Sequence, residues 1–159
     1  MPQRRTPAYR FRSILCGVDF SRHSRAALRC AAALAAAAGA RLTVLFVDDP
    51  LLVAVTSRHG GDNGDGEHRV GRKTRAALAR FVSTSLKTAA APVQCVTAVG
   101  DAGPAIARFA RRHRADLVVV GTRGIGEARA LLFGSTTNDV VRRLRIPVLV
   151  VPLAGRAAR

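Results

Sequence analysis

The 159-residue chain has few aromatic and few acidic residues. It contains no Trp, and aromatic residues make up only 4% of it, so its core must consist of aliphatic side chains and alanine. Its 10 acidic residues are outnumbered by 26 basic ones, of which only Lys73 and Lys87 are lysines, which leaves a net charge of +16. Such an excess is typical of proteins that bind polyanions. A genome rich in the GC-rich codons of Arg and Ala would supply the same arginines without such a partner, and we favour this second explanation.

Cysteines and long apolar runs are also scarce. Cys16, Cys30 and Cys95 form no CxxC pair and no zinc-type spacing with His. We therefore expect buried, reduced thiols in a cytoplasmic protein. No apolar run reaches the roughly 18 residues that a membrane span needs, and no apolar segment of the signal-peptide kind follows the basic start of the chain. The sequence thus predicts neither a membrane protein nor a secreted one.

Apolar and helix-forming segments alternate along the chain. Short runs of Val, Leu and Ile predict strands at residues 13–19, 41–47, 93–99, 116–121 and 147–151. Helices are expected between them, at residues 21–38, 68–89, 101–113 and 135–144. Ser21, Asp101 and Ser135 have the residue types that cap helix N-termini. Strands that alternate with helices form a parallel sheet covered on both faces, so we predict an α/β fold with five parallel strands in the order 3-2-1-4-5.

The composition along the chain indicates one domain with loose ends. We expect residues 12–153 to form this domain, preceded by a flexible basic arm at 1–11 and followed by a tail at 154–159. Residues 56–68, rich in Gly and Asp, are expected to form a mobile loop.

Two of the predicted strands end in unusual residues. The first ends in Gly17-Val18-Asp19, and the fourth ends in the glycine-rich stretch 121–126, which is followed by Gly134-Ser135-Thr136 at the start of a helix. Ligands of such sheets bind beyond the carboxyl ends of the strands. Asp19 is also suited to cap the first helix, and this alternative stays open.

The glycine-rich stretch suits a phosphate group. Glycines let backbone N–H groups approach an anion, and a helix N-terminus adds unpaired N–H groups and a positive dipole end. Ser135 and Thr136 supply hydroxyl groups, and Arg123 supplies positive charge. The GxGxxG fingerprint of dinucleotide-binding proteins is incomplete here, and the Walker GxxxxGK[ST] motif is absent. The stretch therefore favours a polyphosphate site that is neither a standard dinucleotide site nor a P-loop.

At these positions the chain resembles the universal stress proteins. The nucleotide-binding branch of that family carries G-x2-G-x9-G-[ST], which Gly121, Gly124, Gly134 and Ser135 reproduce with both spacings. Residues 14–21, 44–48 and 146–151 match further landmarks in register, so that the likeness covers residues 12–152. The resemblance implies a Rossmann-like fold of the adenine nucleotide alpha hydrolase-like type.

The resemblance also implies roles for individual residues. In ATP-binding relatives the residues that match Gly17, Val18 and Asp19 lie near the adenine and ribose, and Val47 matches a main-chain contact to adenine. Val120 and Gly121 would flank the ribose. The phosphates would lie against Gly124, Gly134, Ser135 and Thr136. The Gly/Asp-rich composition of residues 50–67 departs from the family, so that the rim of the adenine pocket cannot be transferred.

The function that the resemblance implies is a stress-response module that binds ATP, ADP or AMP, with or without Mg²⁺ or Mn²⁺ bridging the phosphates. Family members commonly pair through the fifth strand, so a homodimer through residues 147–151 is expected. A slow ATPase is one alternative, because Glu127 lies in the glycine-rich stretch, although no carboxylate is clearly placed as a base. Non-specific binding of nucleic acid through charge is the other, and a protein partner is not identified.

Overall fold

The computed structural model describes residues 10–51, 66–86, 92–123 and 133–153, and for residues 66–70 it describes the backbone alone. Most of the predicted arm, most of the predicted loop, the tail and Gly124 lie outside these ranges. Strands and helices alternate strictly: β1 Ser13–Val18, α1 Arg22–Ala38, β2 Arg41–Asp48, α3 Gly66–Ser85, β3 Val93–Val99, α4 Ala102–Arg112, β4 Leu117–Gly121, α5 Ser135–Arg143 and β5 Val148–Val151.

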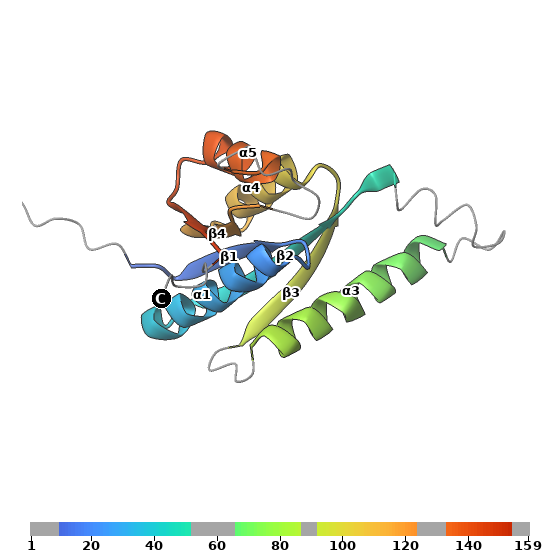
Figure 1. Ribbon diagram of the computed structural model, residues 1–159, viewed down its shortest axis with the longest axis horizontal. Helices are drawn as coiled ribbons and strands as arrows, with labels where there is room; N and C mark the ends of the chain where they lie inside the picture. Colours follow the sequence, from blue (N-terminus) through green and yellow to red (C-terminus); the bar gives the residue numbers. More distant parts are fainter. Residues whose placement is uncertain (1–9, 52–65, 87–91, 124–132, 154–159) are drawn as a thin grey trace, which may run out of the picture.

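The strands form one parallel sheet in the order β3-β2-β1-β4-β5. This confirms the predicted fold and strand order. In Figure 1, α4 and α5 lie above the sheet, and α1 and α3 lie below it. The central strands β1 and β4 are buried on both faces, and this burial explains their unbroken apolar sequences. Among the described residues, no helix is long and apolar enough to cross a membrane.

Two apolar layers hold the helices to the sheet. Alternate residues of β1 divide between them, because Ile14 packs with α1 and α3, whereas Leu15 packs with α4 and α5. The face of α1 that contacts the sheet is largely alanine, with Ala27, Ala31 and Ala35 fully buried. Small side chains at this spacing let the helix lie close to the strands. The core is mainly aliphatic and alanine, as predicted from the composition, and Phe81 and Cys16 are buried in it as well.

Several predicted details need correction. The first strand ends at Val18, one residue before Asp19, because the chain turns there into α1. The third helix begins at Gly66 and ends at Ser85, whereas residues 68–89 were expected. Asp101 occupies the N-cap position of α4 but makes no side-chain capping bond.

The cysteines also differ from the expectation. All three are free thiols, as predicted, but only Cys16 is fully buried, whereas Cys30 and Cys95 are half-buried. Burial raises the pKa of the Cys16 thiol well above its usual range, and the neighbouring Cys30 adds to this rise. Burial also raises the pKa of Cys95.

Candidate functional site

A pocket opens at the carboxyl edge of the sheet, where β1, β2 and β4 end beside the first turns of α4 and α5. The open space inside it, counted out to the solvent at its mouth, is about 520 Å³. The order of the strands explains its place. The chain leaves β1 for one side of the sheet and β4 for the other, and the crevice between two such neighbours is where α/β sheets bind ligands.

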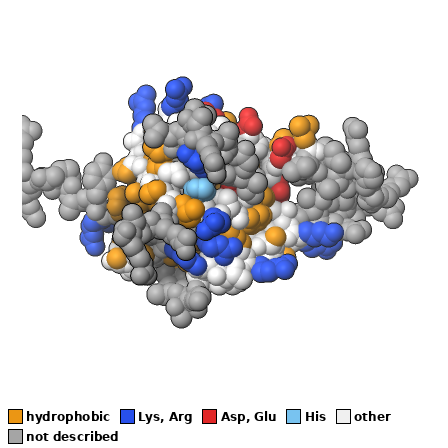
Figure 2. Space-filling view, viewed as in Figure 1, with side chains coloured by type: hydrophobic (Ala, Val, Ile, Leu, Met, Phe, Trp, Pro, Cys, Tyr) orange, Lys and Arg blue, Asp and Glu red, His pale blue; other side chains and the backbone are white. Residues whose placement is uncertain are grey.

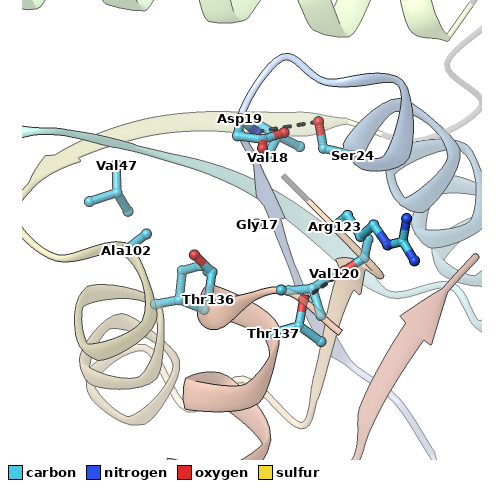
Figure 3. Close-up of a pocket in the computed structure, with 13 residues that line it drawn as sticks. Gly17, Val18, Asp19, Ser24, Val47, Ala102, Val120, Arg123, Thr136 and Thr137 are labelled. Carbon is cyan, nitrogen blue, oxygen red and sulfur yellow. Dashed lines mark hydrogen bonds between the residues drawn. The ribbon is translucent and has the colours of Figure 1, made fainter. Parts of the chain in front are cut away.

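Nine of the eleven predicted site residues line this pocket: Gly17, Val18, Asp19, Val47, Val120, Gly121, Arg123, Gly134 and Thr136. They come from segments more than one hundred residues apart, and the fold brings them together (Figure 3). Ser135 is not among the lining residues, and Gly124 lies outside the described residues. The sequence reasoning missed four further lining residues: Ser24, Ala102, Ile106 and Thr137.

The turn between β1 and α1 holds Asp19 in the pocket wall. One carboxylate oxygen of Asp19 accepts the backbone N–H of Ser21 at 3.0 Å, and the Asp19 N–H donates to Ser24 Oγ at 3.3 Å. Ser21 is the N-cap of α1, as predicted, because its hydroxyl accepts the Ser24 N–H at 3.0 Å. Asp19 therefore supports the start of α1 and also lines the pocket.

Phe20, the residue between Asp19 and Ser21, is fixed by its ring. Its backbone has a φ of +65°, a left-handed conformation that bulky residues rarely adopt. The ring stacks on Phe46 with centroids 4.3 Å apart and meets Phe81 edge-on at 5.3 Å. These aromatic contacts offset the backbone strain, and they anchor the turn that presents Asp19.

The start of α5 is fastened to the end of β4. The Thr137 hydroxyl donates to the Gly121 carbonyl at 2.8 Å, and Thr137 is only 3% exposed. The Gly134 N–H donates to the Thr122 carbonyl at 2.9 Å, which closes the connection on its other side. Figure 3 shows the Thr137 bond as a dashed line beneath the pocket. The first turn of α5 is thereby held against the pocket.

Gly134, and not Ser135, is the N-cap of α5, which corrects the prediction for Ser135. Ser135 is the first helical residue, because the chain enters the helix one residue earlier than the serine suggested. Gly134 has no side chain and makes no capping bond. The first N–H groups of a helix have no hydrogen-bond acceptor within the helix. A glycine cap has no side chain that could accept them, so another group must do so. The positive end of the α5 dipole therefore points into the pocket without a capping side chain.

Gly121 is required by packing. A Cβ at this position would lie 2.8 Å from the backbone carbon and 3.0 Å from the backbone oxygen of His23. Both distances are shorter than van der Waals contact, so only glycine lets β4 end this close to the first turn of α1. The sequence placed this glycine in a stretch suited to a phosphate group, but the packing against His23 requires a glycine here even without a ligand.

The residues that line the pocket include one acidic side chain, Asp19, and one basic side chain, Arg123. On the face shown in Figure 2, acidic side chains in red gather at the upper right, whereas basic ones in blue are spread widely. Arg123 lines the pocket, but in Figure 3 its guanidinium points away from Val47 and Thr136. Within the described part of the chain, no three His, Cys, Asp or Glu side chains are grouped to hold a metal ion. The strongest feature for an anion is therefore backbone, namely the start of α5.

Comparison with known proteins identifies the family. The sequence profile of the universal stress protein family matches residues 10–152. The chain belongs to this family. A universal stress protein of Thermus aquaticus is 33% identical over 141 residues, which cover 89% of this chain and 98% of the relative.

Two solved structures support the same conclusion. Universal stress protein UspA from Lactobacillus plantarum has a TM-score of 0.70 and 29% identity, covering 90% of this chain and 99% of the other. A universal stress protein in complex with cAMP also has a TM-score of 0.70, with 26% identity over 92% of this chain and 100% of the other. The resemblance read from the sequence is thereby confirmed at the level of family and fold.

Proposed function

We propose that this universal stress protein binds an adenine nucleotide at the carboxyl edge of its sheet and acts as a regulatory module. The observation that carries the proposal is the glycine-capped start of α5, held beside Gly121 by Thr137 and turned into a pocket. Such a helix start favours a phosphate group. The relative solved with cAMP supports an adenine nucleotide as the ligand.

In this proposal the backbone carries most of the recognition. The phosphate lies against the first turn of α5, where Gly134 and Thr136 line the pocket. The nucleoside extends toward Asp19 and Val47, which form the opposite wall in Figure 3. Arg123 also lines this pocket, with its guanidinium pointing away from Val47 and Thr136 in Figure 3. ATP, ADP and AMP share these elements, and Mg²⁺ or Mn²⁺ would enter with the phosphates.

A regulatory role fits the site better than fast hydrolysis does. Hydrolysis of ATP requires a group that positions the attacking water and others that neutralise charge. The carboxylate in the described pocket wall, that of Asp19, accepts a backbone N–H from Ser21 and stands on the nucleoside side of the proposed ligand. Glu127 lies outside the described residues. Occupancy of the pocket, sensed by another protein, is the output that we propose.

A substitution that fills the pocket tests this function. Ala102 lines the pocket at the start of α4, and Ala102→Leu keeps a residue that helices accept while it occupies ligand space. Isothermal titration with ATP, ADP, AMP and cAMP should show an affinity at least about tenfold lower in this variant, or ~1.4 kcal/mol. Ala33→Leu, on the exposed side of α1, is the matched control and should bind as the unmodified protein does.

Two results would contradict the proposal. If none of the four nucleotides binds the unmodified protein, and none co-purifies with it by mass spectrometry, then nucleotide binding is wrong. If the two leucine variants bind a nucleotide equally well, then the ligand occupies another site. Thermal unfolding of both variants shows whether a loss of binding comes from a loss of folding.

The edge of the sheet supports the expected dimer as part of this proposal. β5 is a terminal strand of the sheet, and its residues Val148–Val151 are apolar and half-buried. An apolar edge strand favours pairing with another strand, and a second copy of the chain would provide it. Sedimentation of the purified protein at several concentrations should show a dimer, and a monomer throughout would contradict this assignment.

A further inference from the structure

A second hollow lies at the opposite end of the sheet from the nucleotide pocket. It is formed where α4 and α5 end and where the connections to β4 and β5 begin, and it holds about 910 Å³ when counted out to its mouth. We call it the arginine groove, because four of its lining residues are Arg111, Arg114, Arg143 and Arg145. Four guanidinium groups around one hollow are a strong positive charge for a site of this size.

The floor of the arginine groove is apolar. Ala110 is fully buried and Ala115 is 8% exposed, and both belong to the core layer under α4 and α5. Leu144 and Ile146 pack against the same layer while they remain half-exposed, and they complete the floor. The hollow therefore offers aliphatic contact beneath a charged rim.

The rim remains strongly positive after its internal contacts are counted. All four arginines are exposed, and no acidic residue is among those that line the groove. Arg143 faces Asp139 with its Nε 3.8 Å from Oδ2, but both side chains are about half exposed, so that this pair is weak. Arg111 donates to the Arg143 carbonyl at 3.3 Å, which ties the end of α4 to the end of α5. The arrangement matches negative charge on a ligand.

One arginine of the rim stands where the backbone favours glycine. α1 ends with Gly39 at φ +63°, and the Ala40 N–H donates to the Ala35 carbonyl at 2.9 Å. α4 ends in the same way, with Arg114 at φ +51° and the Ala115 N–H donating to Ala110 at 2.9 Å. A left-handed residue at this position is normally glycine. The end of α1 thus has the preferred glycine, whereas the end of α4 has a strained arginine, Arg114, which lines the groove.

We propose that the arginine groove docks a partner protein through a segment that carries both acidic and aliphatic side chains. Carboxylates would pair with the guanidinium groups, which bind them in a forked geometry. Aliphatic side chains would cover the floor between Ala115 and Ile146. Arginines around an apolar centre are the composition of protein–protein contacts. A nucleic acid would use the rim alone, because the lining residues include no aromatic side chain on which a base could stack.

Peptides of controlled composition test this docking site. The probe is a labelled peptide that alternates glutamate and leucine, and its affinity is measured by fluorescence anisotropy at physiological salt. The groove variant carries Arg114→Gly, which relieves the backbone strain, together with Arg145→Gln. The control variant carries Arg75→Gln and Arg80→Gln, two exposed arginines of α3, and loses the same net charge. We expect the groove variant to bind about tenfold more weakly or worse, and the control variant to bind as the unmodified protein does.

Four results would overturn the proposal. The first is equal loss in both variants, which would mean that net charge alone attracts the peptide. The second is equal affinity for a peptide that alternates glutamate and serine, which would mean that the apolar floor is unused. The third is no binding of the glutamate–leucine peptide to the unmodified protein. The fourth is displacement of this peptide by single-stranded DNA at lower concentration, which would assign the groove to nucleic acid. Amide NMR shifts confined to residues 110–115 and 143–146 would support the docking site.

Discussion

The two edges of the sheet differ in the features that each offers to an anion. At the carboxyl edge the strongest feature for an anion is the start of α5 with its glycine cap, and Asp19 stands in the same pocket. At the amino edge the attraction comes from guanidinium groups, and the helices there present their C-terminal ends. Backbone N–H groups bind a small anion at fixed geometry, whereas exposed arginines adapt to a larger and less regular one.

This difference explains why the net charge alone was a poor guide to the position of a binding site and to the kind of ligand. The excess of basic residues points to polyanions in general, yet the pocket proposed for the nucleotide is lined by one arginine, whose guanidinium points away from Val47 and Thr136 in Figure 3. Four arginines line one hollow, the arginine groove, which lies at the amino edge of the sheet. The net charge indicates how strongly the molecule attracts anions. The fold determines where the charged and polar groups lie and therefore which kind of ligand they suit.

The largest effect is expected at Gly121, where β4 meets α1. Gly121→Ala places a methyl group against the His23 backbone, which cannot move aside as a side chain can. We expect the free energy of unfolding to fall by about 3 kcal/mol, measured by urea denaturation. Gly71→Ala is the control, because a Cβ there meets nothing within 4 Å and alanine favours the helix. Equal stabilities of the two variants would show that the close approach of β4 to α1 is not a constraint.

The next effect concerns the bond that fastens α5 at the carboxyl edge. Thr137→Val keeps the shape of the side chain but removes the hydroxyl that donates to the Gly121 carbonyl. Because that carbonyl loses its buried partner, we expect a loss of about 2 kcal/mol in stability. Nucleotide affinity should fall as well, since the start of α5 loses its fixed position.

Thr84→Val is the matched control for Thr137→Val. The Thr84 hydroxyl donates within its own helix to the Arg80 carbonyl at 2.9 Å, at an exposed position. Its removal should change stability by less than about 0.5 kcal/mol and leave nucleotide affinity unchanged. If Thr137→Val binds nucleotide as well as this control does, the start of α5 is not what holds the phosphate.

A smaller effect on stability is expected at the amino edge of the sheet, where α1 and α4 end. Arg114→Gly relieves a left-handed arginine and should stabilise the protein by about 1 kcal/mol, whereas Gly39→Arg should destabilise it by about the same amount. Thermal unfolding of the two variants measures both. A loss of stability in Arg114→Gly would show that Arg114 serves the fold and is not a strained residue at the rim of the groove.

Much of the fold could be predicted because the signals were local and repeated. Unbroken runs such as residues 117–121 fix buried parallel strands, and Ser21 and Gly39 mark the two ends of α1 by residue type alone. The N-cap of α5 was misplaced by one residue because Gly134 and Ser135 both suit that position, and only the path of the chain decides between them.

Two of the four missed pocket residues, Ser24 and Thr137, had a signal in the helix period. Thr137 lies three residues before the buried Val140, and Ser24 lies three and four residues before the buried Ala27 and Leu28. A hydroxyl on an apolar helix face needs a hydrogen-bond partner, and here the partners are at the carboxyl edge. The arginine groove had no such signal. Its residues look like solvated helix faces in the sequence, and only the meeting of α4 and α5 makes them neighbours.

The most direct test of the central claim is an amide NMR titration of the protein with AMP. Binding at the carboxyl edge predicts shifts that concentrate on Gly17, Val18 and Thr136, with none at Arg114 or Ile146. Shifts that concentrate at Arg114 and Ile146, with the carboxyl edge unchanged, would contradict it, because the nucleotide would then bind to guanidinium groups and not to the start of α5.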